Sequence, residues 1–226
     1  MKNKSYIGIS FIILVFGIIF IPKIITRIQS GTIVQNDRMS LLNDKEVDTS
    51  LVVIGNAPSF ELKNQNGKMI SEKQMQDKVY VLEFFFSTCP SICPIMNSNM
   101  KKLDSIYGKN NDFAIASITI NPENDTPEVL KKHAQDLKIT NPNWHFLTGD
   151  KKYIHDLSNN GFNIFAAENS QVNGGFEHSG LFALIDKNGK IRCRKDKNNN
   201  PILYYDGLQA EGIEAIKEDI KKLLEE

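Results

Sequence analysis

The sequence predicts an α/β protein in which a mixed sheet is flanked by helices and preceded by one apolar N-terminal helix. Short apolar runs rich in β-branched and aromatic residues alternate with segments of helical period, which is typical of a sheet covered on both faces. An uncharged apolar run lies near the start of the chain, and a hairpin and a helix close it. The length of 226 residues suits one well-cored domain with an appendage.

The N-terminal run, YIGISFIILVFGIIFI, extends from Tyr6 to Ile21 and follows two lysines. Its length and lack of charge predict a transmembrane helix within residues 1–26. The stretch PKIITRIQSG that follows lacks the small-x-small pattern at which signal peptides are cleaved, so we expect an uncleaved anchor. Residues 27–50 are polar and mix both charges, which predicts a linker, and the folded domain is expected over residues 51–226.

The first elements of the domain are a hairpin, a buried strand and a helix. NAPSFELKNQNGKMIS places short apolar segments on either side of Asn66-Gly67, a dipeptide that favours a tight turn. VYVLEFFF, from Val79 to Phe86, is a nearly continuous run of β-formers, as in a central strand buried on both faces. A helix follows Pro94, because apolar residues recur there at helical spacing. They are Met96, Met100, Leu103 and Tyr107.

The second half of the domain continues this alternation. FAIASITI predicts another buried strand, and TPEVLKKHAQDL predicts a helix with Thr126 as N-cap and Pro127 at its first position. NWHFL predicts a short strand, DKKYIHDLSNNG a helix that ends at a glycine, and LFALIDKNGKIRCR a hairpin that turns at Asn188-Gly189. The terminal helix has an apolar face formed by Ile213, Ile216, Ile220, Leu223 and Leu224. A thioredoxin-like architecture fits this order of elements.

The composition excludes one class of partner and indicates site chemistry. The chain has 27 basic and 27 acidic residues, so it has no net field that would attract nucleic acid. Three cysteines are too few for a disulfide framework in a chain of this size. A close pair with one remote member indicates a reactive or metal-binding site instead.

The close pair lies in FFFSTCPSICPIMN, where Cys89 and Cys93 follow the predicted central strand and enter a helix. The positive end of a helix dipole lowers the pKa of a nearby thiol, and the resulting thiolate both attacks disulfides and binds metal. A spacing of four places both sulfurs on one helical face, close enough to form a disulfide or to bind one ion. A purely structural disulfide would close a very small loop and stabilise little. The pair alone leaves redox and metal chemistry open.

A histidine favours the metal interpretation. Redox enzymes of the thioredoxin fold place a cis-proline opposite their cysteines, before the strand that leads into the final hairpin. This chain has GGFEHSGLFALID at that place, with His178 and no proline. Two thiolates and one imidazole suit Cu(I) by ligand type, while Cu(II) is also compatible and Zn²⁺ is the main competitor. We therefore expect Cys89, Cys93 and His178 to bind a metal ion.

Other candidates are expected to have structural roles. His133 lies among lysines on a helix and is predicted to face solvent. His155 is a candidate to support the site from a second layer of residues. Cys193, in KIRCRK, alternates with two arginines, which predicts a half-buried thiol on the face of Ile191. The polar stretch AAENSQVNGGF before His178 contains Gly174-Gly175 and predicts a mobile arm.

Four stretches resemble the Sco/SenC family of membrane-anchored copper chaperones in order and spacing. They are FFFSTCPSICPIM, SITINPENDTPEVLKKHA, NPNWHFLTGD and HSGLFALIDKNGKIR, and the resemblance runs from about Gly55 to the final helix. It implies a thioredoxin-like domain held by one transmembrane helix in the inner (cytoplasmic) membrane, with the domain on the extracytoplasmic side. The family commonly carries Asp where this chain has Asn121, so one carboxylate that could tune the site is missing.

The resemblance also implies cargo and partners. Copper would bind Cys89, Cys93 and His178 and be delivered to the CuA site of cytochrome c oxidase subunit II, with an upstream copper donor or a thiol reductase as a second partner. Family members deliver copper, reduce the cysteines of the target, or do both. We therefore expect metal delivery rather than enzymatic turnover. The alternatives are a membrane-anchored thiol–disulfide oxidoreductase and a copper or redox sensor, each using the same cysteine pair. A peroxiredoxin-like peroxidase shares the NAPSFELKNQNGK entry, but EFFF lacks the proline that such enzymes place before their cysteine.

Overall fold

The computed structural model describes residues 9–10, 13–22, 50–172 and 174–226. It comprises two compact units, Met1–Asp48 and Thr49–Glu226. In the first unit residues 13–22 are helical. Within the described residues, no helix combines the length and the apolar character that crossing a membrane requires. Residues 1–8, 11–12 and 23–26 of the predicted anchor, and residues 27–49 of the predicted linker, lie outside the described residues.

The second unit is built on one large sheet. Its strands follow the order β1-β10-β9-β4-β5-β6-β2-β3, and β11 pairs with β9 beside this path. A separate two-stranded sheet consists of β7 and β8. The strands are β1 (Val52–Asn56), β2 (Glu61–Asn64), β3 (Met69–Ser71), β4 (Val79–Phe85), β5 (Phe113–Thr119), β6 (Trp144–Thr148), β7 (Ala166–Glu168), β8 (Phe176–His178), β9 (Leu181–Ile185), β10 (Lys190–Cys193) and β11 (Tyr205–Asp206).

The centre of the large sheet is formed by the most apolar runs of the sequence. β4 is parallel to β5, β5 is parallel to β6, and β9 lies antiparallel on the other side of β4. Every residue of β4 and β5 is buried, as predicted for strands covered on both faces. Because β4 and β5 are parallel, the loops that follow Phe85 and Thr119 leave the sheet at the same edge. This edge holds the candidate site.

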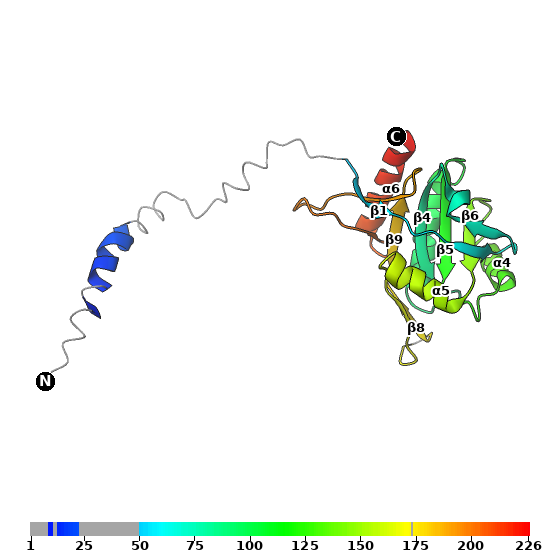
Figure 1. The fold of residues 1–226 in the computed structure, drawn as a ribbon, viewed down its shortest axis with the longest axis horizontal. Coiled ribbons are helices and arrows are strands. Elements are labelled where there is room, and N and C mark those ends of the chain that lie inside the picture. The colour runs from blue at the N-terminus through cyan, green and yellow to red at the C-terminus, as the bar shows by residue number, and fades with distance from the viewer. Residues whose placement is uncertain (1–8, 11–12, 23–49, 173) are drawn as a thin grey trace. The chain divides into compact units, whose positions relative to one another are not determined.

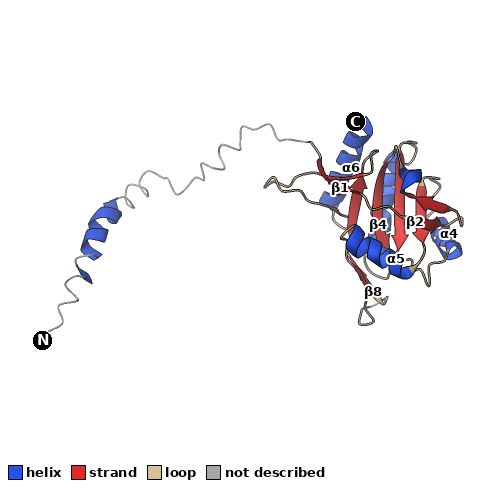
Figure 2. Ribbon diagram, viewed as in Figure 1, coloured by secondary structure: helices blue, strands red, loops and turns tan. Residues whose placement is uncertain are grey.

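Helices cover both faces of the sheet. They are α3 (Cys93–Tyr107), α4 (Pro127–Asp136), α5 (Lys151–Asp156) and α6 (Ala210–Glu225), and a short 3₁₀ turn, η1 (Glu72–Met75), precedes β4. Figures 1 and 2 show α5 in front of the strands and helical ribbon behind them. α3 buries the predicted apolar stripe. α4 begins as predicted, because the Thr126 side chain accepts a hydrogen bond from the Val129 N–H and a proline occupies the first turn.

The structure departs from the predicted elements at three places. The edge strand β1 and the short β11 were not predicted from the apolar pattern, because they pair through the backbone and bury few side chains. The helix at Lys151 continues beyond Asp156 as a π-helical turn, Leu157–Gly161. The polar stretch before His178 forms the β7–β8 hairpin, in which Ala166 lies opposite His178.

A buried ion pair joins the C-terminal helix to the sheet. Asp219 on α6 is fully buried, and Arg194 donates to its two carboxylate oxygens at 2.7 and 2.9 Å. The Tyr205 hydroxyl donates to the same carboxylate at 2.8 Å, and Lys222 donates to it at 3.1 Å. A buried carboxylate that loses its main donor bears the cost of desolvation, so the packing of α6 depends on Arg194.

Arg194→Ala should lower the free energy of unfolding by about 3 kcal/mol, because breaking a buried ion pair costs about 3–5 kcal/mol and Arg194 is partly exposed. Denaturant titration of the full chain measures this change. Lys221→Ala, on the same helix, removes a surface ion pair with Glu225 and should cost less than about 1 kcal/mol. Equal losses in the two variants would contradict the role assigned to Arg194.

Candidate metal centre

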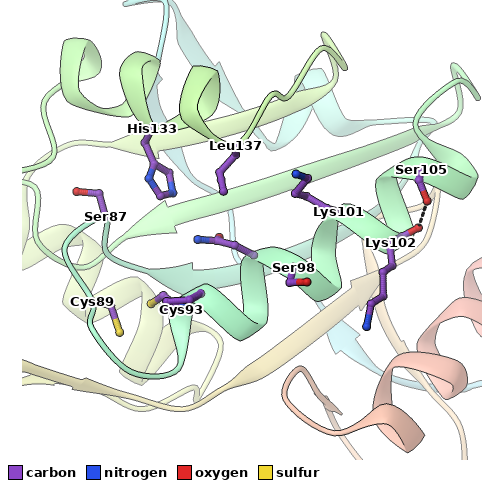
Figure 3. Close-up of a pocket in the computed structure, with 11 residues that line it drawn as sticks. Ser87, Cys89, Cys93, Ser98, Lys101, Lys102, Ser105, His133 and Leu137 are labelled. Carbon is purple, nitrogen blue, oxygen red and sulfur yellow. Dashed lines mark hydrogen bonds between the residues drawn. The ribbon is translucent and has the colours of Figure 1, made fainter.

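The two cysteines lie where β4 passes into α3. β4 ends at Phe85 and α3 begins at Cys93, so Cys89 lies in the connecting loop and Cys93 is the first helical residue. The prediction that both lie on one helical face is therefore wrong. A turn brings them together instead, because the Cys89 N–H donates to the Phe86 carbonyl at 3.2 Å. Both thiols are free and buried, and in Figure 3 the Cys93 side chain extends toward Cys89.

His178 reaches the cysteine loop from the β7–β8 hairpin, which projects beyond the end of the large sheet in Figure 1. Its ring packs edge-on against the Phe86 ring, with centroids 5.8 Å apart, and the Phe176 ring lies 5.4 Å from Phe86. At Gly174, where φ is +98°, an added Cβ would lie 2.9 Å from Cδ of Pro90. A glycine at this position therefore lets the hairpin lie against the cysteine loop.

The structure brings together the three residues that the sequence singled out. The ligand atoms of Cys89, Cys93 and His178 all lie within 4.8 Å of one another. Sγ of Cys93 is 3.2 Å from Nε2 of His178, and Nδ1 of His178 is 3.2 Å from the Ser179 carbonyl oxygen. Because a carbonyl only accepts, Nδ1 carries a proton and Nε2 is the ring atom that faces the sulfurs. Metal-bound histidines are oriented by the same kind of hydrogen bond.

The two sulfurs have opposite electrostatic environments. Burial raises the pKa of the Cys89 thiol, but hydrogen bonds to the thiolate from the His178 ring and from the backbone at Cys93 and Ser91 outweigh burial and lower that pKa to about 5. At Cys93, burial and the nearby charges of Cys89 and Glu83 raise the pKa far above its usual range. At neutral pH, Cys89 is therefore a thiolate and Cys93 a thiol.

This arrangement can support two kinds of chemistry. Two sulfurs and one imidazole nitrogen form a soft donor set of low coordination number, which suits Cu(I) and also binds Cu(II) or Zn²⁺. A thiolate beside a protonated thiol equally suits thiol–disulfide exchange, in which Cys89 attacks and Cys93 resolves the mixed disulfide.

Two buried carboxylates beside the site were not predicted from the sequence. Asp125 accepts hydrogen bonds from the Ser87 N–H at 2.9 Å, from the Thr119 hydroxyl at 2.5 Å and from the Ser87 hydroxyl. It thereby ties the start of the cysteine loop to the end of β5. Glu83, in the middle of β4, accepts from the Ser117 hydroxyl at 2.7 Å, and burial raises its pKa to about 7. The sequence carries a signal for each of them. Glu83 is an acidic residue inside an apolar run, and Asp125 directly precedes the N-cap residue of a helix.

The other singled-out residues lie outside the cysteine–histidine group. His133 is half-buried rather than solvent-facing, because its ring packs 5.6 Å from the rings of both Phe85 and Phe146, so that prediction is wrong. Nε2 of His155 bonds to the Ile120 carbonyl at 2.9 Å, and its ring lies 6.5 Å from that of Phe176. His155 thus lies next to β8 of the hairpin and helps to hold it in place.

Cys193 is more deeply buried than predicted. It lies on the same face of β10 as Ile191, as expected, but it is fully buried. Burial raises the pKa of its thiol. Asn121 lies before α4, and its backbone carbonyl accepts from the Asp125 N–H at 2.9 Å.

Alkylation of Cys89 in the reduced, metal-free protein should follow formation of its thiolate. The lowered pKa means that the rate rises through about pH 5, is constant at neutral pH, and is lost as the pH falls below that value. Iodoacetamide labelling with peptide mapping measures this profile. Cys93 and Cys193, whose pKa values are raised, serve as internal controls and should remain unmodified at neutral pH. An inflection for Cys89 above about pH 8 would contradict the assignment.

Asp125→Ala should release the start of the cysteine loop. Because Ser87 and Thr119 lose a charged acceptor, we expect the free energy of unfolding to fall by about 2–4 kcal/mol and Cys93 to become accessible to alkylation. Asp125→Asn keeps an acceptor oxygen and should have an intermediate effect. If Asp125→Ala destabilises the protein but leaves Cys93 as protected as before, the carboxylate does not position the loop.

Comparisons with known proteins show which family this chain belongs to. The pattern of the SCO1/SenC family matches residues 55–211. Among curated proteins, the SCO1 protein homolog of Bacillus subtilis (strain 168) is 31% identical over 151 residues, which covers 66% of this chain and 77% of that relative.

Solved structures share the fold. BsSco, a member of the Sco family of cytochrome c oxidase assembly proteins in which a disulfide switch was identified, aligns with a TM-score of 0.63 and 27% identity, over 76% of this chain and 95% of its own. ScoI of Bradyrhizobium japonicum, solved with copper bound, aligns with a TM-score of 0.58 and 22% identity, over 74% of this chain and 99% of its own. The predicted thioredoxin-like mixed α/β domain is confirmed. Since the family pattern covers more than half of its length, this chain belongs to the SCO1/SenC family.

Proposed function

We propose that this protein binds copper through Cys89, Cys93 and His178 and delivers it to the CuA site of cytochrome c oxidase subunit II during assembly of the oxidase. The observation that carries the proposal is the convergence of two thiols and one imidazole within 4.8 Å. Cys93 and His178 are 85 residues apart in the sequence, and they meet only because a projecting hairpin folds over the cysteine loop. Such a convergence of soft donors supports a ligand role for all three.

Ligand chemistry and membership of the family both support copper as the cargo. Thiolates select Cu(I) among the common metals, and imidazole binds both valences of copper. Three protein donors leave the ion open to a ligand from another molecule, which suits a metal that is passed on. The copper-bound relative ScoI has the same fold, and BsSco belongs to the family of oxidase assembly proteins.

Delivery proceeds by exchange of ligands. Cys89 lies in a loop and His178 at the end of a hairpin strand, so either can leave the ion while two donors still hold it. Cys93 is 2% exposed and Cys89 is 8% exposed, so the thiolates of the client replace Cys89 and His178 before Cys93. The ion thereby stays bound to at least one protein sulfur until the client holds it.

The opposite pKa shifts of the two thiols favour a second candidate function, thiol–disulfide exchange with the client. The Cys89 thiolate attacks a client disulfide, forms a mixed disulfide and releases one client thiolate. Cys93 passes its proton to His178 and attacks the Cys89 sulfur, which leaves a Cys89–Cys93 disulfide and a second client thiol. This disulfide cannot bind copper, so oxidation would also release the ion, and a thiol reductase would be needed to restore the pair.

The proposal also covers the cellular location of the protein. Residues 1–26 would form a single transmembrane helix in the cytoplasmic membrane, and residues 27–50 a linker to a domain on the extracytoplasmic side. The uncharged apolar run and the absence of a cleavage pattern support the anchor. An upstream donor on that side would supply the copper.

A copper titration tests the proposal. The full chain, purified in detergent and reduced without oxygen, should bind one Cu(I), and Cys89→Ser and Cys93→Ser should each weaken binding by at least about a hundredfold. His178→Ala should weaken it by at least about tenfold, since even residues that only orient a ligand contribute about 10–100-fold. The Cu(II) form should show a sulfur-to-copper charge-transfer band that both cysteine variants lose.

Two variants are matched controls for this titration. Cys193→Ser and His145→Ala change a buried thiol on β10 and an imidazole on β6, both outside the group, and should leave the affinity unchanged. If His178→Ala binds copper with full affinity and the same spectrum, the three-ligand site is wrong. If copper binds weakly and the reduced protein rapidly reduces insulin disulfides, the second candidate function replaces the first.

A further inference from the structure

An open cleft leads away from the metal centre between α3 and α4. Its volume is about 540 Å³, and it begins at Ser87, Cys89 and Cys93. From there it follows one face of α3 through Asn97, Ser98, Lys101, Lys102 and Ser105, while His133 and Leu137 of α4 form the opposite wall. Figure 3 shows these two side chains directed toward α3 and the cysteines at one end of the row. The cleft is of the size that binds a small ligand or a short peptide segment.

Two polar atoms in the walls of this cleft are buried without a hydrogen-bond partner in the described part of the chain. They are Oδ1 of Asn97 and Nε2 of His133. Asn97 is 6% exposed, and its Oδ1 is buried without a hydrogen bond to any of the described residues. Unsatisfied buried groups are rare and costly. A side-chain amide can pair with both the N–H and the carbonyl of an extended backbone, so these atoms indicate a peptide occupant.

The charge of the cleft lining favours a negatively charged ligand. Its described lining residues include two lysines and no acidic residue. Lys102 donates to Asn99 at 2.9 Å, whereas no ion pair joins Lys101 to a described carboxylate. In Figure 3 the Lys101 ammonium lies on the side of α3 that faces α4. From Cys93 to Lys101 the helix rises about 12 Å, which about four residues of an extended peptide span.

We propose that this cleft docks an extended segment of the protein partner in which a cysteine lies about four residues from a carboxylate. The cysteine of the segment reaches Cys89 and Cys93, the backbone pairs with Asn97, and the carboxylate lies at Lys101. The inference rests on the proposed transfer of copper or thiols at the cysteine pair. It assigns the partner's chemistry and its direction of approach, which the three ligands alone do not define.

Dye-labelled nine-residue peptides test this proposal by fluorescence anisotropy with the reduced, metal-free full chain in detergent. Peptides with one cysteine and a glutamate four residues before or after it are compared with the same peptides carrying lysine for glutamate or serine for cysteine. We expect one of the two glutamate peptides to bind about tenfold more tightly than its lysine counterpart, with the preference declining as salt is added.

Lys101→Glu should abolish or reverse this preference, whereas Lys63→Glu, which makes the same charge change on β2, should leave it intact. Asn97→Ala should weaken both glutamate and lysine peptides, and its thermal unfolding confirms that it is folded. Equal binding of acidic and basic peptides, or equal effects of Lys101→Glu and Lys63→Glu, would overturn the proposal. Tighter binding of an acidic tripeptide thiol than of the longer peptides would also overturn it, in favour of a small thiol ligand.

A copper titration of the same variants separates this inference from the function on which it rests. Lys101→Glu should bind Cu(I) as the unmodified chain does, because Lys101 is not one of the clustered donors. Normal copper binding without a charge preference among peptides would refute the cleft alone. A clear charge preference in a chain that binds no copper would refute copper delivery and leave the cleft as a docking site for a redox partner.

Discussion

The hydrogen bonds that Asp125 accepts from Ser87 and Thr119 join the ends of two parallel central strands, and the candidate site depends on this junction. Parallel pairing of β4 and β5 places the loops after both strands at one edge of the sheet. A loop held only at its ends could take many conformations, whereas a loop tied to a buried carboxylate with four protein donors can take few. The cysteine loop is therefore fixed at Ser87, two residues before Cys89.

The second support of the site is the β7–β8 hairpin. Phe86 packs against both Phe176 and His178, and Gly174 lets the hairpin lie against Pro90. These contacts hold the imidazole beside the sulfurs, and the Ser179 carbonyl selects the ring nitrogen that faces them. The cysteine loop follows a strand of the central sheet, whereas the hairpin belongs to a separate sheet, so the imidazole can move away without disturbing the two sulfurs.

The pKa values of the two cysteines, which are four residues apart, are shifted in opposite directions. Cys89 is stabilised as a thiolate by hydrogen bonds, whereas burial keeps Cys93 protonated. Binding a metal through both sulfurs would require Cys93 to release its proton to solvent, because Nε2 of His178, at 3.2 Å, would itself bind the ion. The same asymmetry orders the steps of thiol–disulfide exchange, with Cys89 attacking first. In both proposed functions metal binding and redox chemistry would use one set of atoms, and the cleft between α3 and α4 would give both the same approach for a partner.

The sequence by itself determined the central strands, the amphipathic helices, the N-cap of α4 and the identity of the three clustered residues. These features follow from local periodicity, capping chemistry and the types of residue in short motifs. Only the tertiary structure decided that Cys89 precedes the helix, that His133 packs between Phe85 and Phe146, and that the polar stretch before His178 forms a hairpin. It also decided the roles of Asp125 and Glu83, whose burial cannot be read from an apolar pattern. The physical reason is that burial, hydrogen bonds between distant residues and the resulting pKa shifts arise from contacts across the sheet, which neighbours in the sequence do not specify.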